Sequence, residues 1–299
     1  MRIVTRADFD GIVCAALLYE AEHVTDPVHW VEPSDMQHGL VKIRRDDIIA
    51  NLPFVKGCSL WFDHHYTNQP SQPFRGSYKI APSAAGLVHE YYKEKLQHDY
   101  TELIRSADDI DSANLTLEQV RQPENHPYLL ISMTIASRHK QDEPYWNRLV
   151  QFLRATPIAK IMADKEVKTR CAETIKQNNI FEGLLHQYTR VHNRVAVSDF
   201  RSFEKAPDGN RFLVYSLFPE AMVAVKIRYA IEDRKKVIIS VGHSIFNRSC
   251  RVNVGRMLAD FGGGGHAGAG AASIHKDRAD EYIPKIINIL SRNEALTEG

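Results

Sequence analysis

Asp63-His64-His65 places three side chains that bind metals or move protons next to one another. The triplet directly follows the apolar run Cys58–Phe62, which predicts a short strand buried on both faces. In open α/β sheets, ligands gather at the carboxyl ends of the strands. A carboxylate followed by two imidazoles offers hard and borderline donors, which suit Mn²⁺, Fe²⁺ or Zn²⁺. The triplet therefore indicates metal or proton chemistry at one edge of a sheet.

Carboxylates also accompany other strand-like segments. They occur as Asp8 and Asp10 just before Gly11, as Asp46-Asp47 before Ile48, and as Asp108, Asp109 and Asp111 further along the chain. An alternative for the first pair is a helix cap beside a solvated carboxylate. Because the carboxyl ends of parallel strands meet at one edge, we expect these groups to converge, and they would repel one another unless cations neutralised them. Two metal ions would balance this charge and lower the pKa of a bridging water for attack on phosphorus.

The segment 262–271 is rich in glycine, and His266 is its one bulky side chain. Consecutive glycines such as Gly264 and Gly265 let backbone N–H groups approach an anion closely. The segment is neither a Walker A loop nor a Rossmann fingerprint, and a flexible linker is the alternative. Upstream, Arg248 lies between an asparagine and a serine, which together offer donors for phosphate oxygens, although a solvated turn fits that stretch equally well. We expect a loop that contacts phosphate.

The elements around these residues predict an α/β fold in two domains. Strand-like and helix-like segments alternate through the first half, which implies a mostly parallel sheet with helices on both faces; the segments are strands at 2–6, 28–31 and 59–62 and helices at 11–19 and from Ser83. Residues 144–191 are helical in pattern and are expected to connect two lobes. Beyond them the pattern predicts a smaller mixed α/β domain, with strands at 195–198, 211–215, 221–229 and 236–241 and helices at 254–261 and 283–290. We place the domains at 1–190 and 191–299.

Composition narrows the class of protein. The chain of 299 residues carries 38 basic and 37 acidic side chains, so no overall charge indicates a long polyanion or a membrane surface as partner. Its four cysteines form no C-x-x-C pair, which argues against a disulfide framework and a structural zinc site. No apolar run is long enough to span a bilayer, and the first residues enter a strand directly. We therefore expect a reduced, cytoplasmic setting.

Taken together and in this order, the motifs resemble the DHH phosphoesterase superfamily with its DHH-associated C-terminal domain. They are D-F-D-G, the acidic pair at 46–47, D-H-H, a fourth acidic segment, N-R-S and G-G-G-G-H-A-G-A-G-A. The resemblance covers nearly the whole chain and is strongest to a bacterial, exopolyphosphatase-like branch, which is related to RecJ-type exonucleases and oligoribonucleases. It implies a fold with a catalytic metal-binding domain followed by a substrate-binding domain.

The resemblance also implies roles for individual residues. The expected ligands of two divalent ions, usually manganese, with magnesium or another divalent ion as alternative, are Asp8, Asp10, Asp47, His64 and Asp111, the last with Asp108 as alternative. Asp63 would orient a histidine and His65 would face the phosphate, so that both act in catalysis. From the second domain, His266, with Gly264 and Gly265, and Arg248 would bind the substrate's phosphate.

One position departs from the family pattern. Many members carry a histidine just before the first acidic pair, whereas this chain has Arg6 nearest to that place. One ion would then have fewer protein ligands and bind more weakly. Arg6 would instead contact a phosphate or pair with a ligand carboxylate.

These observations favour a metal-dependent phosphoesterase that hydrolyses a short oligonucleotide or a small nucleotide by a two-metal mechanism. The alternatives are an exopolyphosphatase and, because of the missing histidine, a catalytically weak nucleotide-binding module. A phosphate-containing small molecule or a short nucleic acid is the expected partner, with no membrane involved. A homodimer is left open.

Overall fold

The computed structural model describes residues 1–136 and 140–294 of the chain. They form two compact units. The first contains Met1–Leu115 and Pro123–Ala172, and the second contains Thr116–Gln122 and the chain from Glu173 on. The division between the units falls within one long helix, α9 (Lys165–Tyr188). The domain limits of 1–190 and 191–299 stay predictions.

The first unit is built on a five-stranded sheet with the order β2-β1-β3-β4-β5, in which every neighbouring pair is parallel. Its strands are β1 (Arg2–Thr5), β2 (His29–Trp30), β3 (Asp47–Ala50), β4 (Leu60–Asp63) and β5 (Gly76–Tyr78). Every residue of β3 and β4 is buried, and the apolar run at 59–62 predicted this for β4. This confirms the predicted α/β class and parallel sheet.

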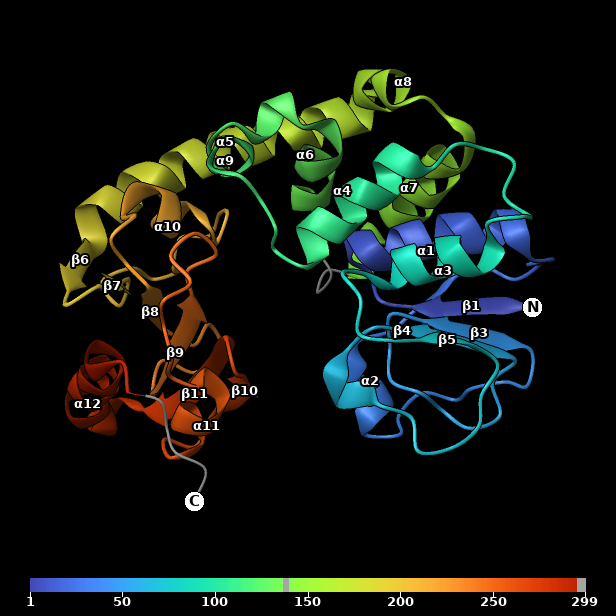
Figure 1. Cartoon of the computed structure of the whole chain (residues 1–299). Coiled ribbons are helices and arrows are strands. Elements are labelled where there is room, and N and C mark those ends of the chain that lie inside the picture. Colours follow the sequence, from blue (N-terminus) through green and yellow to red (C-terminus); the bar gives the residue numbers. More distant parts are fainter. Residues whose placement is uncertain (137–139, 295–299) are drawn as a thin grey trace. The chain divides into compact units, whose positions relative to one another are not determined.

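Helices cover both faces of this sheet (Figure 1). On one face lie α1 (Phe9–Ala21) and α3 (Ala84–Tyr92), and α1 is buried along most of its length because α3, α4 and α7 also pack against it. On the other face, Met36 of α2 (Pro33–Gln37) packs in a cluster with Val4, Ile49 and Trp61. The remaining helices of the unit are α4 (Thr101–Asp111), α6 (Pro127–Met133), α7 (Glu143–Ala155) and α8 (Ile158–Ala163), with single 3-10 turns η1 (Tyr66–Asn68), η2 (Pro123–Asn125) and η3 (Lys140–Asp142).

The second unit contains a six-stranded mixed sheet with the order β10-β11-β9-β8-β7-β6. Only β7 and β8 pair in parallel among these strands, and the other neighbours are antiparallel. The strands are β6 (Thr189–His192), β7 (Val195–Asp199), β8 (Val223–Tyr229), β9 (Lys236–His243), β10 (Gly264–His266) and β11 (Ala269–His275). The helices are α5 (Leu117–Arg121), α10 (Leu213–Leu217), α11 (Val254–Ala259) and α12 (Ala279–Arg292), with the 3-10 turn η4 (Lys276–Arg278).

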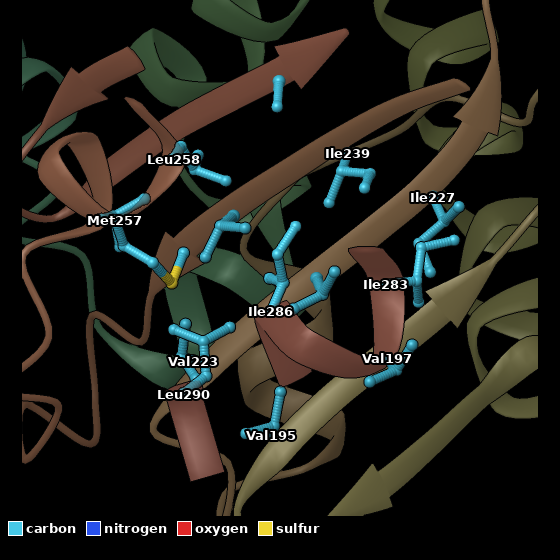
Figure 2. Packing of buried hydrophobic residues seen from close by; sticks show 14 of the residues in the cluster. Val195, Val197, Val223, Ile227, Ile239, Met257, Leu258, Ile283, Ile286 and Leu290 are labelled. Atoms are coloured by element: carbon cyan, nitrogen blue, oxygen red, sulfur yellow. The ribbon is translucent and has the colours of Figure 1, made fainter. Parts of the chain in front are cut away.

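Two amphipathic helices close the core of this second unit. Figure 2 shows Ile283, Ile286 and Leu290 of α12 against the inward side chains of the sheet, with Met257 and Leu258 of α11 beside them. The apolar spacing in 283–290 predicts this packing, since residues three and four apart share one face of a helix.

Three predicted elements are wrong. Residues 189–191, expected as the end of a helical stretch, lie in β6, and the expected loop 262–271 contains β10 and the start of β11. Residues 211–215 were expected as a strand, but Leu213–Leu217 form α10. The side-chain Oδ1 of Asn210 accepts a hydrogen bond from the Phe212 N–H at 3.0 Å, and its carbonyl accepts from the Leu213 N–H at 3.1 Å. Such an asparagine turn starts a helix, and it overrides the strand preference of the aromatic and branched residues that follow.

Among the described residues, no helix is both long and apolar enough to cross a bilayer.

Candidate metal centre

The D-H-H triplet lies at the carboxyl end of β4, and Asp63 organises it. The Asp63 carboxylate is fully buried and accepts hydrogen bonds from the His64 backbone N–H at 2.9 Å and from Asn68 Nδ2 at 2.6 Å. It also lies 2.8 Å from Nδ1 of His65, which donates to it. The hydrogen bonds of Asp63 thus stabilise the turn from His64 to Asn68 and fix the orientation of the His65 ring.

His65 presents the rest of its ring outward. Its side chain is 39 % exposed, and the hydrogen bond to Asp63 raises the pKa of the imidazole. Because Nδ1 is held by Asp63, the free Nε2 is the atom available to a phosphoryl or leaving-group oxygen.

His64 turns the other way, into the protein. Its Nδ1 lies 3.0 Å from the carbonyl oxygen of Ala81, which only accepts, so Nδ1 carries the proton. Nε2 is buried, has no hydrogen-bond partner among the described residues, and lies 3.2 Å from Oδ2 of Asp111 and 3.8 Å from Oδ2 of Asp10. A backbone carbonyl that fixes the tautomer in this way is typical of histidines that bind metals.

Asp10 reaches this place from the first turn of α1. Its buried carboxylate accepts the backbone N–H groups of Ala84 and Ala85, at 3.0 and 2.7 Å, at the start of α3. Gly11 lets α1 begin so close to β1, because a Cβ at this position would overlap the carbonyl oxygen of Arg6. Burial raises the pKa of Asp10 well above its usual value, and the neighbouring carboxylates Asp111 and Asp8 raise it further.

Asp111, rather than Asp108, completes the group. Asp111 is the last residue of α4, and burial and the charge of Asp8 raise its pKa. Asp108 accepts a hydrogen bond of 2.6 Å from the hydroxyl of Ser83, which in turn caps α3 through the Gly86 N–H. Asp108 therefore supports the helix that binds Asp10, while Asp111 faces His64.

The ligand atoms of Asp10, His64 and Asp111 all lie within 4.8 Å of one another, and we call them the three-ligand cluster. With the imidazole neutral and both carboxyl groups ionised, only acceptors meet here, and a cation between them would balance their charge. Two carboxylates and an imidazole suit Mn²⁺, Fe²⁺, Zn²⁺ or Mg²⁺. The residues present thus fit a divalent ion. Asp63, His64 and His65 also approach within 4.8 Å, but the hydrogen bonds of Asp63 occupy that group.

The structure does not bring Asp47 to the cluster. Asp47 begins β3, so it lies at the amino end of the sheet, about 10 Å along the strand from its carboxyl end. Its fully buried carboxylate is bound by the Arg2 guanidinium at 2.7 and 2.9 Å and by the Arg44 backbone N–H at 2.7 Å. Asp47 is the partner of a nearly buried ion pair.

Asn51 stands at the carboxyl end of β3 instead, and sequence reasoning missed it. It is 2 % exposed, and its Nδ2 donates to Oδ1 of Asp8 at 2.9 Å. The signal was present in the sequence, because the apolar run Ile48-Ile49-Ala50 ends directly before Asn51. The polar residue after that run, not the one before it, marks the carboxyl end of the strand.

Asp8 lies beside the cluster and caps α1. Its Oδ1 accepts the Gly11 N–H at 2.9 Å, and its Oδ2 lies 3.3 Å from Nη1 of Arg6. Burial raises the pKa of Asp8, and the charge of Arg6 opposes this rise. The Arg6 guanidinium also lies 3.8 Å from Oε2 of Glu32.

The predicted phosphate-binding residues lie in the second unit. Gly264, Gly265 and His266 form β10, which pairs with β11 in a short hairpin, and His266 is exposed at its end. Gly265 has a φ of 149°, and a Cβ there would overlap Ala269. Arg248 is exposed in a turn before α11, where its Nε donates to the Ile245 carbonyl at 3.2 Å. The glycines thus allow close strand pairing, and the part of these residues in binding phosphate stays a prediction.

Solved structures resemble the whole chain. A pGpG-specific phosphodiesterase, PggH from Vibrio cholerae, is 30% identical, with a TM-score of 0.85 over 98% of this chain and 99% of that one. RecJ from Thermus thermophilus in complex with Mn²⁺ is 13% identical with a TM-score of 0.55 over 97% of this chain and 52% of its own. An exopolyphosphatase-related protein from Bacteroides fragilis is 12% identical, with a TM-score of 0.54 over 97% of this chain and 92% of its own. The last two show the fold alone.

No protein-family model and no curated protein matches the sequence.

Proposed function

Since this chain belongs to the DHH phosphoesterase superfamily, whose members are hydrolases, we propose that it is a divalent-metal-dependent phosphodiesterase that cleaves short nucleotides such as the dinucleotide pGpG. The observation that carries the metal dependence is the three-ligand cluster, in which the buried Nε2 of His64 faces two carboxylates without a donor. The substrate class is supported by the similarity to the pGpG-specific enzyme, which extends over nearly the full length of both chains.

Asp10, His64 and Asp111 would hold the ion. When bound, a divalent ion supplies positive charge for the phosphoryl oxygens and a water of lowered pKa. Manganese is the favoured ion, since the ligand set combines carboxylates with an imidazole.

His65 acts next to this position. Asp63 accepts its Nδ1 proton and raises the pKa of the ring, which favours the protonated form. The exposed Nε2–H then donates to an oxygen of the phosphate, where negative charge grows as water attacks. As the new P–O bond forms and the bond to the ribose oxygen breaks, a proton from His65 or from solvent goes to the leaving oxygen. For pGpG the products would be two molecules of GMP.

An exposed aromatic ring favours a substrate that carries a base. Tyr66 directly follows His65 and is 75% exposed. The turn that presents it is fixed, because Asn68 donates to Asp63 and the Tyr78 hydroxyl donates to the His65 carbonyl at 3.1 Å. A nucleobase stacks well on such a ring, whereas inorganic polyphosphate has no group to place there. The predicted phosphate contacts of His266, Gly264, Gly265 and Arg248 in the second unit form part of the proposal.

The test is a comparison of substrates on one metal-loaded preparation. With Mn²⁺ we expect hydrolysis of pGpG and related short dinucleotides, and slower turnover of longer oligonucleotides, cyclic dinucleotides, nucleoside 3′,5′-bisphosphates and polyphosphate. His64→Ala is the inactive control, with its fold checked by circular dichroism. The proposal fails if folded protein that holds the metal hydrolyses no phosphodiester, and preferred hydrolysis of polyphosphate would make it an exopolyphosphatase.

A further inference from the structure

Asp8 differs from the three-ligand cluster in the side-chain donor and the fixed positive charge that the protein places beside it. Oδ1 accepts from the Gly11 N–H and from Asn51 Nδ2, both at 2.9 Å. Oδ2 lies 3.3 Å from the guanidinium of Arg6. Asp10 also accepts two backbone N–H groups, so what sets Asp8 apart is the side-chain amide on its Oδ1 and the fixed cation beside its Oδ2.

Asn51 strengthens this contrast. Its side chain is buried at the carboxyl end of β3, and the amide group turned toward Asp8 is a donor, because a carboxylate only accepts. A donor and an acceptor satisfy each other without a cation between them. At the three-ligand cluster, by contrast, only acceptors meet.

Arg6 brings a permanent positive charge to the same place. Its guanidinium is 3.3 Å from Asp8 and 3.8 Å from Glu32, and its side chain is 37% exposed, so it faces the solvent side of the site. A guanidinium has five N–H donors and remains charged at every pH at which the protein folds. A guanidinium fixed beside Asp8 repels a divalent ion that would bind at the same carboxylate.

We propose that the centre holds one tightly bound divalent ion, at Asp10, His64 and Asp111, and that the guanidinium of Arg6 occupies the position of a second cation beside Asp8. In the phosphodiesterase on which this inference rests, the free N–H groups of Arg6 bind a non-bridging oxygen of the scissile phosphate. Arg6 is therefore both the substitute for an ion and a substrate-binding residue.

Metal binding tests the first half of the proposal without reference to activity. We expect equilibrium dialysis of the whole chain at micromolar free Mn²⁺ to give one bound ion per chain. The electron paramagnetic resonance spectrum should show the hyperfine pattern of an isolated Mn²⁺ ion. Two ions of similar affinity, or the spectrum of a coupled pair, would overturn the proposal even if the protein is an active phosphodiesterase.

Variants test the second half. Arg6→His combined with Asn51→Asp replaces the cation and the donor by two ligands, so this variant should bind a second ion. Arg6→Ala should keep the tight ion and lower kcat/KM for the dinucleotide on the order of 100-fold, the usual effect of losing a donor to developing charge. Arg6→Lys, which keeps the charge but not the fork of donors, should recover part of this loss. Unchanged kcat/KM in Arg6→Ala would contradict the role of Arg6 in binding substrate. If the protein cleaves no substrate at all, the number of ions bound by the wild type and by the double variant still tests whether Arg6 replaces a second ion.

Discussion

Nε2 of His64 and Oδ2 of Asp111 lie 3.2 Å apart, and Nδ1 on the other side of the same ring lies 3.0 Å from the Ala81 carbonyl oxygen. This pair joins the carboxyl end of β4 to the last residue of α4, and a divalent ion between the two atoms would make the contact favourable. Substitutions of these two residues and of their neighbours therefore separate metal binding from stability and from substrate binding.

Replacing His64 should abolish metal binding and activity together. His64→Ala removes the nitrogen ligand of the cluster, so we expect kcat/KM to fall at least about 100-fold. Substituting residues that only hydrogen-bond to metal ligands already lowers metal affinity or activity by about 10–100-fold. Binding of Mn²⁺ to the native state should raise the melting temperature of the wild type by mass action, and the variant should lose this rise. A metal-dependent rise that persists in the variant would place the ion elsewhere.

Substitutions of Asp111 and Asp108 should differ in whether they weaken metal binding or lower stability. Asp111→Asn should weaken Mn²⁺ binding at least about tenfold in calorimetric titration. Asp108→Asn is the matched control: it should leave the affinity unchanged and lower the free energy of unfolding by about 1 kcal/mol, since Ser83 loses a charged acceptor. The reverse pattern would make Asp108 the ligand.

Asp47 should matter for stability and not for the metal. Asp47→Ala leaves the Arg2 guanidinium without its buried partner, which typically lowers the free energy of unfolding by about 3 kcal/mol or more. Replacing both residues, as Arg2→Met with Asp47→Leu, should restore much of this loss in urea unfolding. Mn²⁺ affinity should be unchanged in both proteins, and a loss as large as that of Asp111→Asn would restore Asp47 as a ligand.

The contribution of His65 to stability should depend on pH. In the metal-free protein Asp63 raises the pKa of His65 above its unfolded value, so folding favours the protonated ring. The resulting stability is fully present below the unfolded pKa of about 6.5 and is lost as the pH rises through the higher folded value. Since the ring is 39 % exposed, the effect should stay below about 1 kcal/mol. In urea unfolding with EDTA, the difference in the free energy of unfolding between the wild type and His65→Gln should shrink as the pH rises. A difference that is the same at every pH would mean that the charge on His65 does not stabilise the fold.

Tyr66 should act on substrate binding. Tyr66→Ala removes a stacking surface, and loss of one base stack typically lowers affinity by about 1–3 kcal/mol, so KM for the dinucleotide should rise about tenfold with little change in kcat. Tyr66→Phe, which keeps the ring, is the control. The wild type and both variants should cleave an abasic analogue of the same dinucleotide equally well. If Tyr66→Ala raises KM for this analogue as much as for the dinucleotide, Tyr66 does not bind the base.

The sequence by itself determined the class of fold and the place of the chemistry. The buried apolar run before the D-H-H triplet predicts the strand that forms as β4, and the triplet directly after it marks the edge at which ligands collect. The helix that begins at Ser83 and the helix over 283–290 are local patterns, and both formed as predicted.

Tertiary structure alone decided which polar residues meet. Asp108 and Asp111 are three residues apart on one helix and share a face, so their spacing does not distinguish them. The hydroxyl of Ser83, from a distant segment, donates to Asp108, and Asp111 is left to face His64. Asp47 and Asn51 flank the same strand, and the ion pair with Arg2 on the neighbouring strand fixes which end each occupies. Contacts between residues far apart in sequence set these choices, because a strand or helix presents several polar side chains and only the packing of its neighbours selects among them.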